Sequence, residues 1–159
     1  MIEIVNYTEQ TKEHVKTLNY EWLEKYFAVE PNDVIQLADP KTEIIDKGGL
    51  IYYAKNEGLI VGTVSLLKVD EDVYELGKMA VSEKAQGLGI GKIMIEHCFK
   101  VAREIGIFKL VLYSNTSLKP AIHLYEKYGF KAITLEPGHY GRANIKMEKV
   151  LSLPLDGSS

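Results

Sequence analysis

The segment of residues 78–97, KMAVSEKAQGLGIGKIMIEH, constrains the fold of this chain more than any other segment. Gly87, Gly89 and Gly91 stand between an apolar run that ends at Val81 and apolar residues at helical spacing up to Ile105. Glycine tolerates backbone conformations that other residues avoid, and it leaves its own N–H group uncovered. The segment therefore predicts a strand, a glycine loop and an amphipathic helix, in that order.

Short apolar, β-branched segments alternate with helical patterns along the rest of the chain, which is typical of a mixed α/β domain. We expect strands at about residues 2–6, 49–55, 59–68, 73–81, 109–114, 130–135 and 143–149. Only KNEG separates the second strand from the third, so these two should form an antiparallel hairpin. Helices are expected over residues 11–27, in a shorter segment between 33 and 46 that ADP interrupts, over 90–105, and from about 116 to 129.

Length and composition limit the classes of protein that the chain could represent. A chain of 159 residues fits one domain, expected over residues 1–152, with a flexible tail at 153–159. The net charge of −3 and the lack of a basic block argue against a nucleic-acid partner, and no apolar run is long enough to span a membrane. The N-terminus lacks a leader pattern, so we expect a cytoplasmic protein, monomeric or homodimeric.

The cysteine and histidine residues give little indication of a nucleophilic or metal-binding role. Cys98 is the single cysteine and falls on the inner face of the helix over residues 90–105, where a thiol behaves as a small hydrophobic group. His97 and His123 also fall on helices and are expected to be structural. Because the histidines show no metal-ligand spacing, we expect no metal site.

The glycine cluster is open to three interpretations. A dinucleotide fingerprint, G-x-G-x-x-G, would need its third glycine at Lys92. A P-loop would need glycine at Gln86 and serine or threonine at Ile93, so its magnesium ligand is absent. The third interpretation is a loop whose bare N–H groups, together with the positive end of the following helix, bind a diphosphate.

Two motifs resemble those of the GNAT superfamily of N-acetyltransferases. Gln86-Gly-Leu-Gly-Ile-Gly91 resembles the Q/R-x-x-G-x-G/A loop, and residues 121–130, AIHLYEKYGF, resemble the A-x-x-L-Y-x-x-x-G-F segment about 35 residues downstream. The resemblance covers residues 1–150 approximately. It implies an α/β fold with a twisted, mostly antiparallel sheet of seven strands, flanked by about four helices. Its fourth and fifth strands would splay apart to admit acetyl-coenzyme A.

The resemblance also implies which residues bind the co-substrate. An asparagine often stands three residues before the motif alanine in this family, whereas here that position is Leu118 and the nearest asparagine is Asn115. Asn115 is therefore the candidate to contact the pantetheine. The full implied set is Met79, Ala80, Val81, Gln86, Gly87, Leu88, Gly89, Ile90, Gly91, Lys92, Asn115, Ala121 and Tyr125.

Acetyl transfer to an amine needs a proton acceptor, because an alkylammonium has a pKa near 10.4 and cannot attack while protonated. Glu75 resembles the general base of several GNAT enzymes. Period-two alternation would put Glu75, Gly77, Met79 and Val81 on one face of the strand, unless a bulge intervenes. The alternative is that Glu75 only pairs with Lys78 or another cation.

Two further roles follow from the resemblance. The main chain of Met79 and Val81 would stabilise the oxyanion and pair with the pantetheine, with their side chains in the core. Tyr125 matches the family's proton donor to the departing thiolate. The alternative for Tyr125 is a packed helix residue whose hydroxyl has no role in the chemistry.

The acceptor pocket of GNAT proteins is usually built from the first helical region and the loop before the last strand. Trp22, Tyr26, Phe27 and Glu30 would contribute from the first, and His139 and Tyr140 from the second. The same aromatic residues could equally be core, and EPGHYGRA could be an ordinary hairpin. The expected activity is acetylation of a primary amine of a small molecule. The alternatives are a peptide or protein amine, or a module that senses acyl-coenzyme A without turnover.

Overall fold

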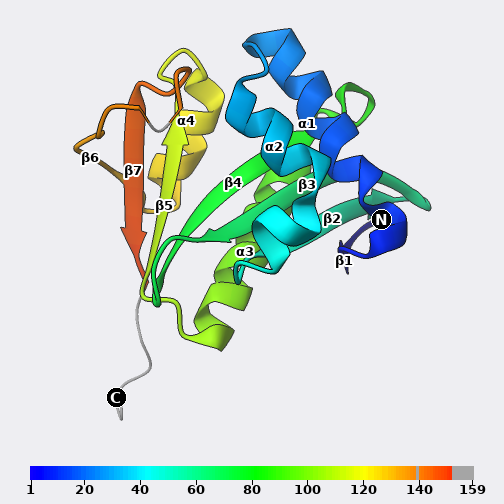
Figure 1. The fold of residues 1–159 in the computed structure, drawn as a ribbon, viewed down its shortest axis with the longest axis horizontal. Helices are drawn as coiled ribbons and strands as arrows, with labels where there is room; N and C mark the ends of the chain where they lie inside the picture. Colours follow the sequence, from blue (N-terminus) through cyan, green and yellow to red (C-terminus); the bar gives the residue numbers. More distant parts are fainter. Residues whose placement is uncertain (139, 152–159) are drawn as a thin grey trace.

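The computed structural model describes residues 1–138 and 140–151. Seven strands form one sheet in the order β1-β2-β3-β4-β5-β7-β6 (Figure 1). Every neighbouring pair is antiparallel except β4 and β5, which are parallel. The strands are β1 (Ile2–Asn6), β2 (Leu50–Asn56), β3 (Leu59–Lys68), β4 (Val73–Val81), β5 (Lys109–Ser114), β6 (Lys131–Ile133) and β7 (Ile145–Val150).

The sheet opens between its two parallel strands. Strands β4 and β5 are paired only from Val73 to Glu75 and from Lys109 to Val111, although β4 continues to Val81 and β5 to Ser114. Beyond this short ladder the two strands diverge, as Figure 1 shows. The backbone N–H and C=O groups along the gap therefore lack the partner strand that the rest of the sheet provides.

The helices cover both faces of the sheet. On one face lie α1 (Glu13–Tyr26), α2 (Pro31–Ala38) and the short turn η2 (Lys41–Ile45); α3 (Ile90–Ile105) and α4 (Lys119–Lys127) lie on the other (Figure 1). Short 3₁₀ turns precede α1 and α3, namely η1 (Glu9–Thr11) and η3 (Glu83–Ala85). Each face has its own buried apolar cluster, so the sheet separates two cores.

Local sequence explains where the helices begin and end. Helix α3 buries Ile90, Met94, Cys98 and Ala102 at intervals of one turn, and Gly106 ends it in the left-handed conformation with φ 82°. Helix α2 starts with Pro31, whose fixed φ suits a first turn. It ends at Ala38 because Asp39 precedes Pro40 and is biased away from helical geometry.

The predicted fold is confirmed. The mixed seven-stranded sheet, the splay between the fourth and fifth strands and the helices are present, and most strand ends agree within two residues. The bounds of two elements differ from the predicted ones. Helix α4 begins at Lys119 rather than near residue 116, and β6 covers only Lys131–Ile133. The tail predicted at 153–159 lies outside the described residues.

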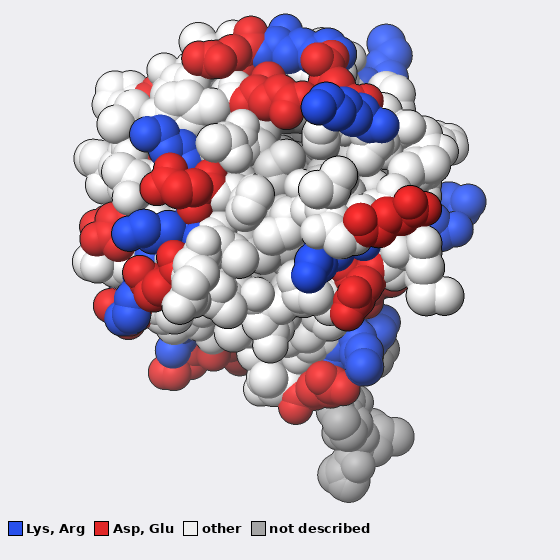
Figure 2. Space-filling model, turned by 90° about the vertical axis from the view of Figure 1, so that its right-hand side faces the viewer, with Lys and Arg blue, Asp and Glu red and all other residues white. Residues whose placement is uncertain are grey.

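The surface carries interspersed charges on the face seen in Figure 2. Acidic and basic side chains alternate around the rim of this face, and uncharged side chains fill its centre. No block of one sign gathers there. Among the described residues, no helix combines the length and the apolar character needed to cross a membrane.

Candidate active site

A cavity of about 430 Å³ occupies the gap between β4 and β5. Its walls come from β4, the glycine loop, the start of α3, the end of β5, α4 and the C-terminal half of α1. Predicted site residues that line it are Trp22, Phe27, Glu75, Met79, Ala80, Val81, Gln86, Gly87, Gly89, Ile90, Gly91, Lys92, Asn115, Ala121, Tyr125 and Tyr140. The structure thus brings together residues from four separate parts of the sequence.

Some predicted residues lie elsewhere. Leu88 and Tyr26 are 52% and 45% exposed, and neither belongs to the described lining of the cavity. Tyr26 packs instead against Trp22, with ring centroids 5.6 Å apart. Glu30 is also outside the described lining, and His139 lies outside the described residues.

The glycine loop is open toward the cavity. Gly87 and Gly89 have φ of 82° and 74°, a region that favours glycine, and Gly89 is the residue that caps the N-terminus of α3. A Cβ added at Gly87, Gly89 or Gly91 would meet no protein atom within 4 Å. Open space therefore lies beside the backbone at these three positions. The first N–H groups of α3, which have no acceptor within the helix, also lie at this loop. The loop therefore fits an anionic group.

A β-bulge in β4 separates Glu75 from the residues that follow it. Thr63 of β3 pairs with Ala80, and Ser65 pairs with Gly77, so Lys78 and Met79 together face a single partner position. Lys78 takes φ 51°, which is unusual for a residue with a side chain. Backbone strain of this kind is typical of functional sites.

The bulge overturns the expected single face. Glu75 lies beside Gly77 and near Leu67, on the side of the α1 and α2 core. Met79 and Val81 pack instead against the core beneath α3. The extra residue reverses the alternation of side chains, so Glu75 does not share a face with Met79 and Val81, and the bulge that the prediction named as its exception is present.

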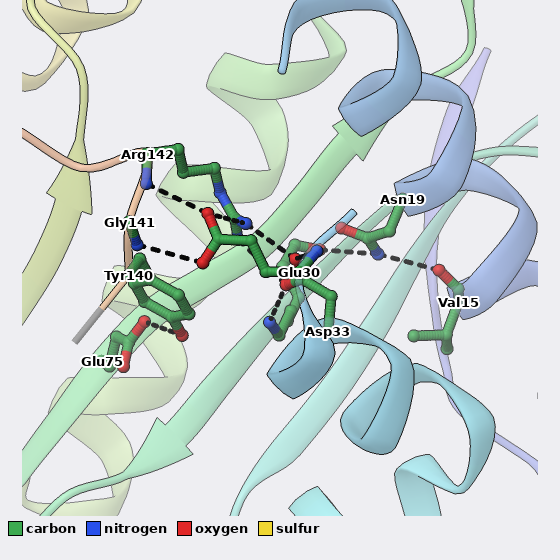
Figure 3. A network of polar contacts seen from close by, with 9 residues as sticks. Val15, Asn19, Glu30, Asp33, Glu75, Tyr140, Gly141 and Arg142 are labelled. Carbon is green, nitrogen blue, oxygen red and sulfur yellow. Dashed lines mark hydrogen bonds and ion pairs between the residues drawn. The ribbon is translucent and has the colours of Figure 1, made fainter. Parts of the chain in front are cut away.

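Glu75 is buried, with 6% of its surface exposed, and it contacts the connection between β6 and β7. The hydroxyl of Tyr140 donates a hydrogen bond to Glu75 Oε2 at 3.0 Å (Figure 3). Burial, and then the neighbouring Glu75 charge, raise the pKa of the Tyr140 phenol, so Tyr140 stays protonated and remains a donor. Glu75 and Tyr140, which are 65 positions apart in the sequence, therefore form one hydrogen-bonded pair beside the cavity.

A buried ionic cluster surrounds this unit (Figure 3). Lys78 Nζ lies 3.1 Å from Asp33 Oδ1, and these side chains are only 3% and 1% exposed. Arg142 Nη1 and Nη2 donate to the two Asp33 oxygens at 2.7 and 3.0 Å. Asn19 donates from Nδ2 to the Lys78 carbonyl at 3.3 Å, which ties α1 to the bulge. We call Lys78, Asp33, Arg142 and Glu30 the Asp33 cluster.

The cluster shifts the ionisation of its members. Burial by itself would raise the pKa of Asp33, but hydrogen bonds from Arg142 and from the Glu30 backbone, with the charge of Lys78, lower it below the ordinary value. Burial lowers the pKa of the Lys78 ammonium, and the Asp33 charge opposes that change. The two cations therefore favour the ionised form of Asp33, and Asp33 in turn opposes the loss of the Lys78 charge.

The carboxylate of Glu30 holds the connection between β6 and β7 by hydrogen bonds to its backbone. Its Oε1 and Oε2 accept hydrogen bonds from the backbone N–H groups of Gly141 and Arg142, each at 3.0 Å. Arg142 Nη1 also approaches Glu30 Oε2 at 3.4 Å. Together with Asp33, Glu30 thus links α2 to the segment that carries Tyr140.

The opposite wall of the cavity carries Tyr125 and Asn115. Burial raises the pKa of the Tyr125 phenol to about 12, so it is a protonated group at neutral pH. Asn115 uses its amide within the protein: Nδ2 donates to the Arg142 carbonyl at 2.9 Å, and Oδ1 accepts from the Ser117 N–H at 2.9 Å. Asn115 therefore orients the segment before β7 as well as lining the cavity.

The remaining candidates have ordinary surroundings. Cys98 is fully buried, and burial raises the pKa of its thiol to about 12, which makes it a poor nucleophile. Trp22 and Phe27 contact each other with ring centroids 5.5 Å apart and line the cavity together. Within residues 1–138 and 140–151, no group of three or more metal-ligating side chains gathers.

Sequence reasoning missed most of the Asp33 cluster. The sequence pattern indicates Asp33 only as a boundary of a helical segment and indicates no role for Asn19. Arg142 is a candidate to face the acceptor from the EPGHYGRA loop, with an ordinary polar hairpin as the alternative. Lys78 was considered as a partner for Glu75, whereas it pairs with Asp33. One available signal was a lysine inside an otherwise apolar strand, since a buried lysine is almost always paired.

The fold and the cavity define the class of protein first. A crystal structure of a GNAT-family acetyltransferase from Staphylococcus aureus superposes with a TM-score of 0.85, covering 96% of this chain and all of that one at 22% identity. The PaiA N-acetyltransferase of Thermoplasma acidophilum, solved in complex with coenzyme A, superposes with a TM-score of 0.73 over 95% of this chain and 99% of that one, at 18% identity. The fold is thus that of the GNAT acetyltransferases.

Sequence comparison then gives the family itself. Residues 10–130 match the acetyltransferase (GNAT) family, and the chain belongs to it. The N-acetyltransferase family 8 member 2 of Rattus norvegicus is 30% identical over 109 residues, which are 65% of this chain and 46% of that protein. The N-acetyltransferase YjgM of Escherichia coli is 28% identical over 132 residues, 80% of this chain and 76% of that one. The chain spans less than half the length of the rat relative.

Proposed function

We propose that this protein transfers an acetyl group from acetyl-coenzyme A to a primary amine of a small molecule. The observation that carries the proposal is the single cavity that runs from the open glycine loop to the carboxylate of Glu75, through the gap between β4 and β5. One end suits a diphosphate and the other holds a carboxylate. Membership of the acetyltransferase family supports the same activity.

The residues of the cavity fit coenzyme A as a co-substrate. The N–H groups of residues 87–92, at the N-terminus of α3, would bind its diphosphate, helped by the helix dipole and by Lys92. The unpaired edge of β4 from Met79 to Val81 would pair with the pantetheine arm, as a neighbouring strand would. Asn115 and Ala121 would line the opposite side of that arm.

The transfer itself needs few groups. The amine nitrogen attacks the thioester carbonyl carbon and gives up a proton to Glu75, directly or through a water molecule. Backbone N–H groups near the bulge would stabilise the oxyanion that forms on the carbonyl oxygen. The C–S bond then breaks with its electron pair passing to sulfur, and Tyr125 supplies a proton to the thiolate. Direct attack in a ternary complex accounts for every atom without a covalent enzyme intermediate.

Thermal unfolding with and without acetyl-coenzyme A tests the proposal, with ATP and NAD as controls. A ligand at 100 times its Kd should stabilise the native state by about 2.7 kcal/mol and raise Tm by several degrees. Gly89→Glu should abolish the shift while the unliganded protein stays folded, because a carboxylate would repel the diphosphate. An equal shift in the variant, or no shift in the wild-type protein at saturation, would refute the proposal.

A further inference from the structure

The acceptor of the proposed reaction must be held within the larger cavity. A second cavity, of about 250 Å³, lies beyond Glu75 and Tyr140, and the hydrogen bond between these two side chains separates it from the larger one. The body of a molecule whose amine reaches Glu75 would therefore lie among the other residues that surround Glu75 in the larger cavity. The chemistry of those residues indicates which acceptors fit.

The C-terminal half of α1 gives this part of the cavity an aromatic wall. Trp22 and Phe27 line the cavity with ring centroids 5.5 Å apart, and both residues are partly exposed. Asn19, one turn before Trp22, donates a hydrogen bond to the carbonyl of Lys78 in the bulge. The wall therefore lies beside the bulge that follows Glu75, where it can cover an apolar group.

The ring of Tyr140 is already occupied by contacts within the protein. Lys78 Nζ and Arg142 Cζ lie 5.1 and 4.9 Å from the centroid of this ring, and its hydroxyl donates to Glu75 (Figure 3). Cations at this distance are attracted to the face of an aromatic ring. An apolar group of the acceptor is therefore expected against Trp22 and Phe27.

The cations beside Glu75 are also paired within the protein. Lys78 Nζ lies 3.1 Å from Asp33, while Arg142 donates to both oxygens of Asp33 and approaches Glu30 Oε2 at 3.4 Å. Asp33 and Glu30 thus balance these two cations, and Glu75 adds a further carboxylate. A carboxylate on the acceptor would have to disrupt a buried pair or lie near Glu75 without a counter-ion, and both arrangements are unfavourable.

Lys92 is the remaining cation among the described residues that line the cavity. It lies in the first turn of α3, next to the glycine loop, where the proposed function places the diphosphate. This is the opposite end of the cavity from Glu75. The charge of Lys92 would therefore bind the co-substrate and not the acceptor.

We propose that the acceptor is a primary amine joined to an apolar body, with no carboxylate of its own. The body lies against Trp22 and Phe27, and the ammonium is attracted by Glu75 before it loses its proton. This inference rests on the proposed acetyltransferase function and deepens it by naming the class of acceptor. Free amino acids fall outside that class.

Three related ligands test the charge. Phenethylamine has an amine and an apolar ring, phenylalanine adds a carboxylate beside the amine, and phenylalaninol keeps the branch but makes it neutral. Their binding to the protein saturated with coenzyme A is measured by calorimetry at neutral pH, so no turnover is needed. We expect phenethylamine and phenylalaninol to bind at least about tenfold more tightly than phenylalanine, because like charges placed together repel.

A charge variant makes this comparison specific. Glu30→Gln removes a carboxylate beside Arg142 at a residue outside the described lining of the cavity, so discrimination against phenylalanine should fall. Asp46→Asn, in an exposed pair with Lys41, should leave that discrimination unchanged.

A second comparison tests the aromatic wall. Ethylamine lacks the ring of phenethylamine, and we expect it to bind about ten- to hundredfold more weakly, the factor for burying one aromatic ring. Trp22→Leu and Phe27→Leu should each reduce this ratio by weakening the binding of phenethylamine alone. Phe108→Leu, which removes an exposed ring outside the described lining of the cavity, is the matched control.

The outcomes separate this inference from the proposed function. Binding of phenylalanine as tight as that of phenethylamine, or binding of phenylalaninol as weak as that of phenylalanine, would overturn the inference. Equal binding of ethylamine and phenethylamine, or no measurable binding of any of these amines, would do the same. In each case the proposed function stands if acetyl-coenzyme A still stabilises the protein. Absence of that stabilisation would overturn both.

Discussion

Individual residues at the site are tuned by their neighbours. Glu75 is a buried carboxylate held by Tyr140, and Tyr140 is in turn fixed by a segment whose backbone binds to Glu30. In the proposed mechanism, Tyr140 is a positioning residue for Glu75. A proton acceptor must keep one orientation toward the amine, and these contacts would hold the Glu75 carboxylate in place.

Replacement of Glu75 tests the base assignment. We expect Glu75→Gln to lower kcat about 100-fold, a usual effect of removing a general base, and to change the pH profile of turnover. The thermal shift given by acetyl-coenzyme A should remain, because the diphosphate binds elsewhere. Glu71→Gln, at an exposed position in the β3–β4 hairpin, is the matched control. A wild-type pH profile in Glu75→Gln would remove this residue from the mechanism.

Asp33 stabilises the site through a pair of buried cations. Asp33→Asn would leave Lys78 and Arg142 without their shared counter-ion, and loss of one partner from a buried ion pair costs about 3–5 kcal/mol. We expect the free energy of unfolding in urea to fall by about that amount. Asp46→Asn, which breaks an exposed pair with Lys41, should change it by less than about 1 kcal/mol. Equal losses in both variants would contradict a buried cluster.

At the scale of elements, Gly91 lowers the stability of α3, and the proposed function offers a reason for it. Gly91 lies in the first turn of α3, it is not among the glycines with positive φ, and it has room for a Cβ. Alanine would be better for the helix than glycine by up to about 1 kcal/mol. In the proposed function, glycine at this position gives a phosphate access to the N–H groups.

Gly91→Ala should accordingly have two effects of opposite sign. Unliganded protein should unfold at higher urea concentration, by up to about 1 kcal/mol, because helix propensity improves. The thermal shift with acetyl-coenzyme A should shrink, because the methyl group would keep the diphosphate away from the helix N-terminus. Greater stability with unchanged affinity would mean that no phosphate approaches this turn.

Across the whole molecule, the Asp33 cluster joins α2, β4 and the segment before β7, and Asn19 connects it to α1. These parts surround the cavity, so the ionisation of one carboxylate affects how the site is held together. The pKa of Asp33 is lower in the folded protein than the ordinary value near 3.9. Its contribution to stability is therefore complete above that ordinary value and is lost as pH falls through the lower, folded-state pKa.

Acid unfolding should show this dependence. We expect the difference in unfolding free energy between wild-type protein and Asp33→Asn to be constant from pH 7 to about pH 5 and to narrow below pH 4. Urea titrations at pH 7, 5, 4 and 3 would measure it. A difference that persists unchanged at pH 3 would show that Asp33 contributes through packing and not through its charge.

The sequence determined the strands, the helices and the glycine loop, because each depends on neighbours close in the chain. Period-two and helical spacing, the KNEG turn and the glycines at 87, 89 and 91 are local signals, and they predicted the elements. The seven-stranded sheet and its splay were predicted from the resemblance to a family. The role of Glu75 as a proton acceptor stays a prediction, which its place before the glycine loop suggests by resemblance to the family.

Tertiary structure alone decided the bulge, the Asp33 cluster and the second cavity. A bulge depends on the register with a partner strand, so no count along β4 could show that Lys78 reverses the faces of Glu75 and Met79. Asp33 and Arg142 are 109 residues apart and meet only once the sheet has assembled. Whether a charged residue is solvated or buried depends on what packs over it, and for Lys78 and Asp33 that information is carried by distant segments of the chain.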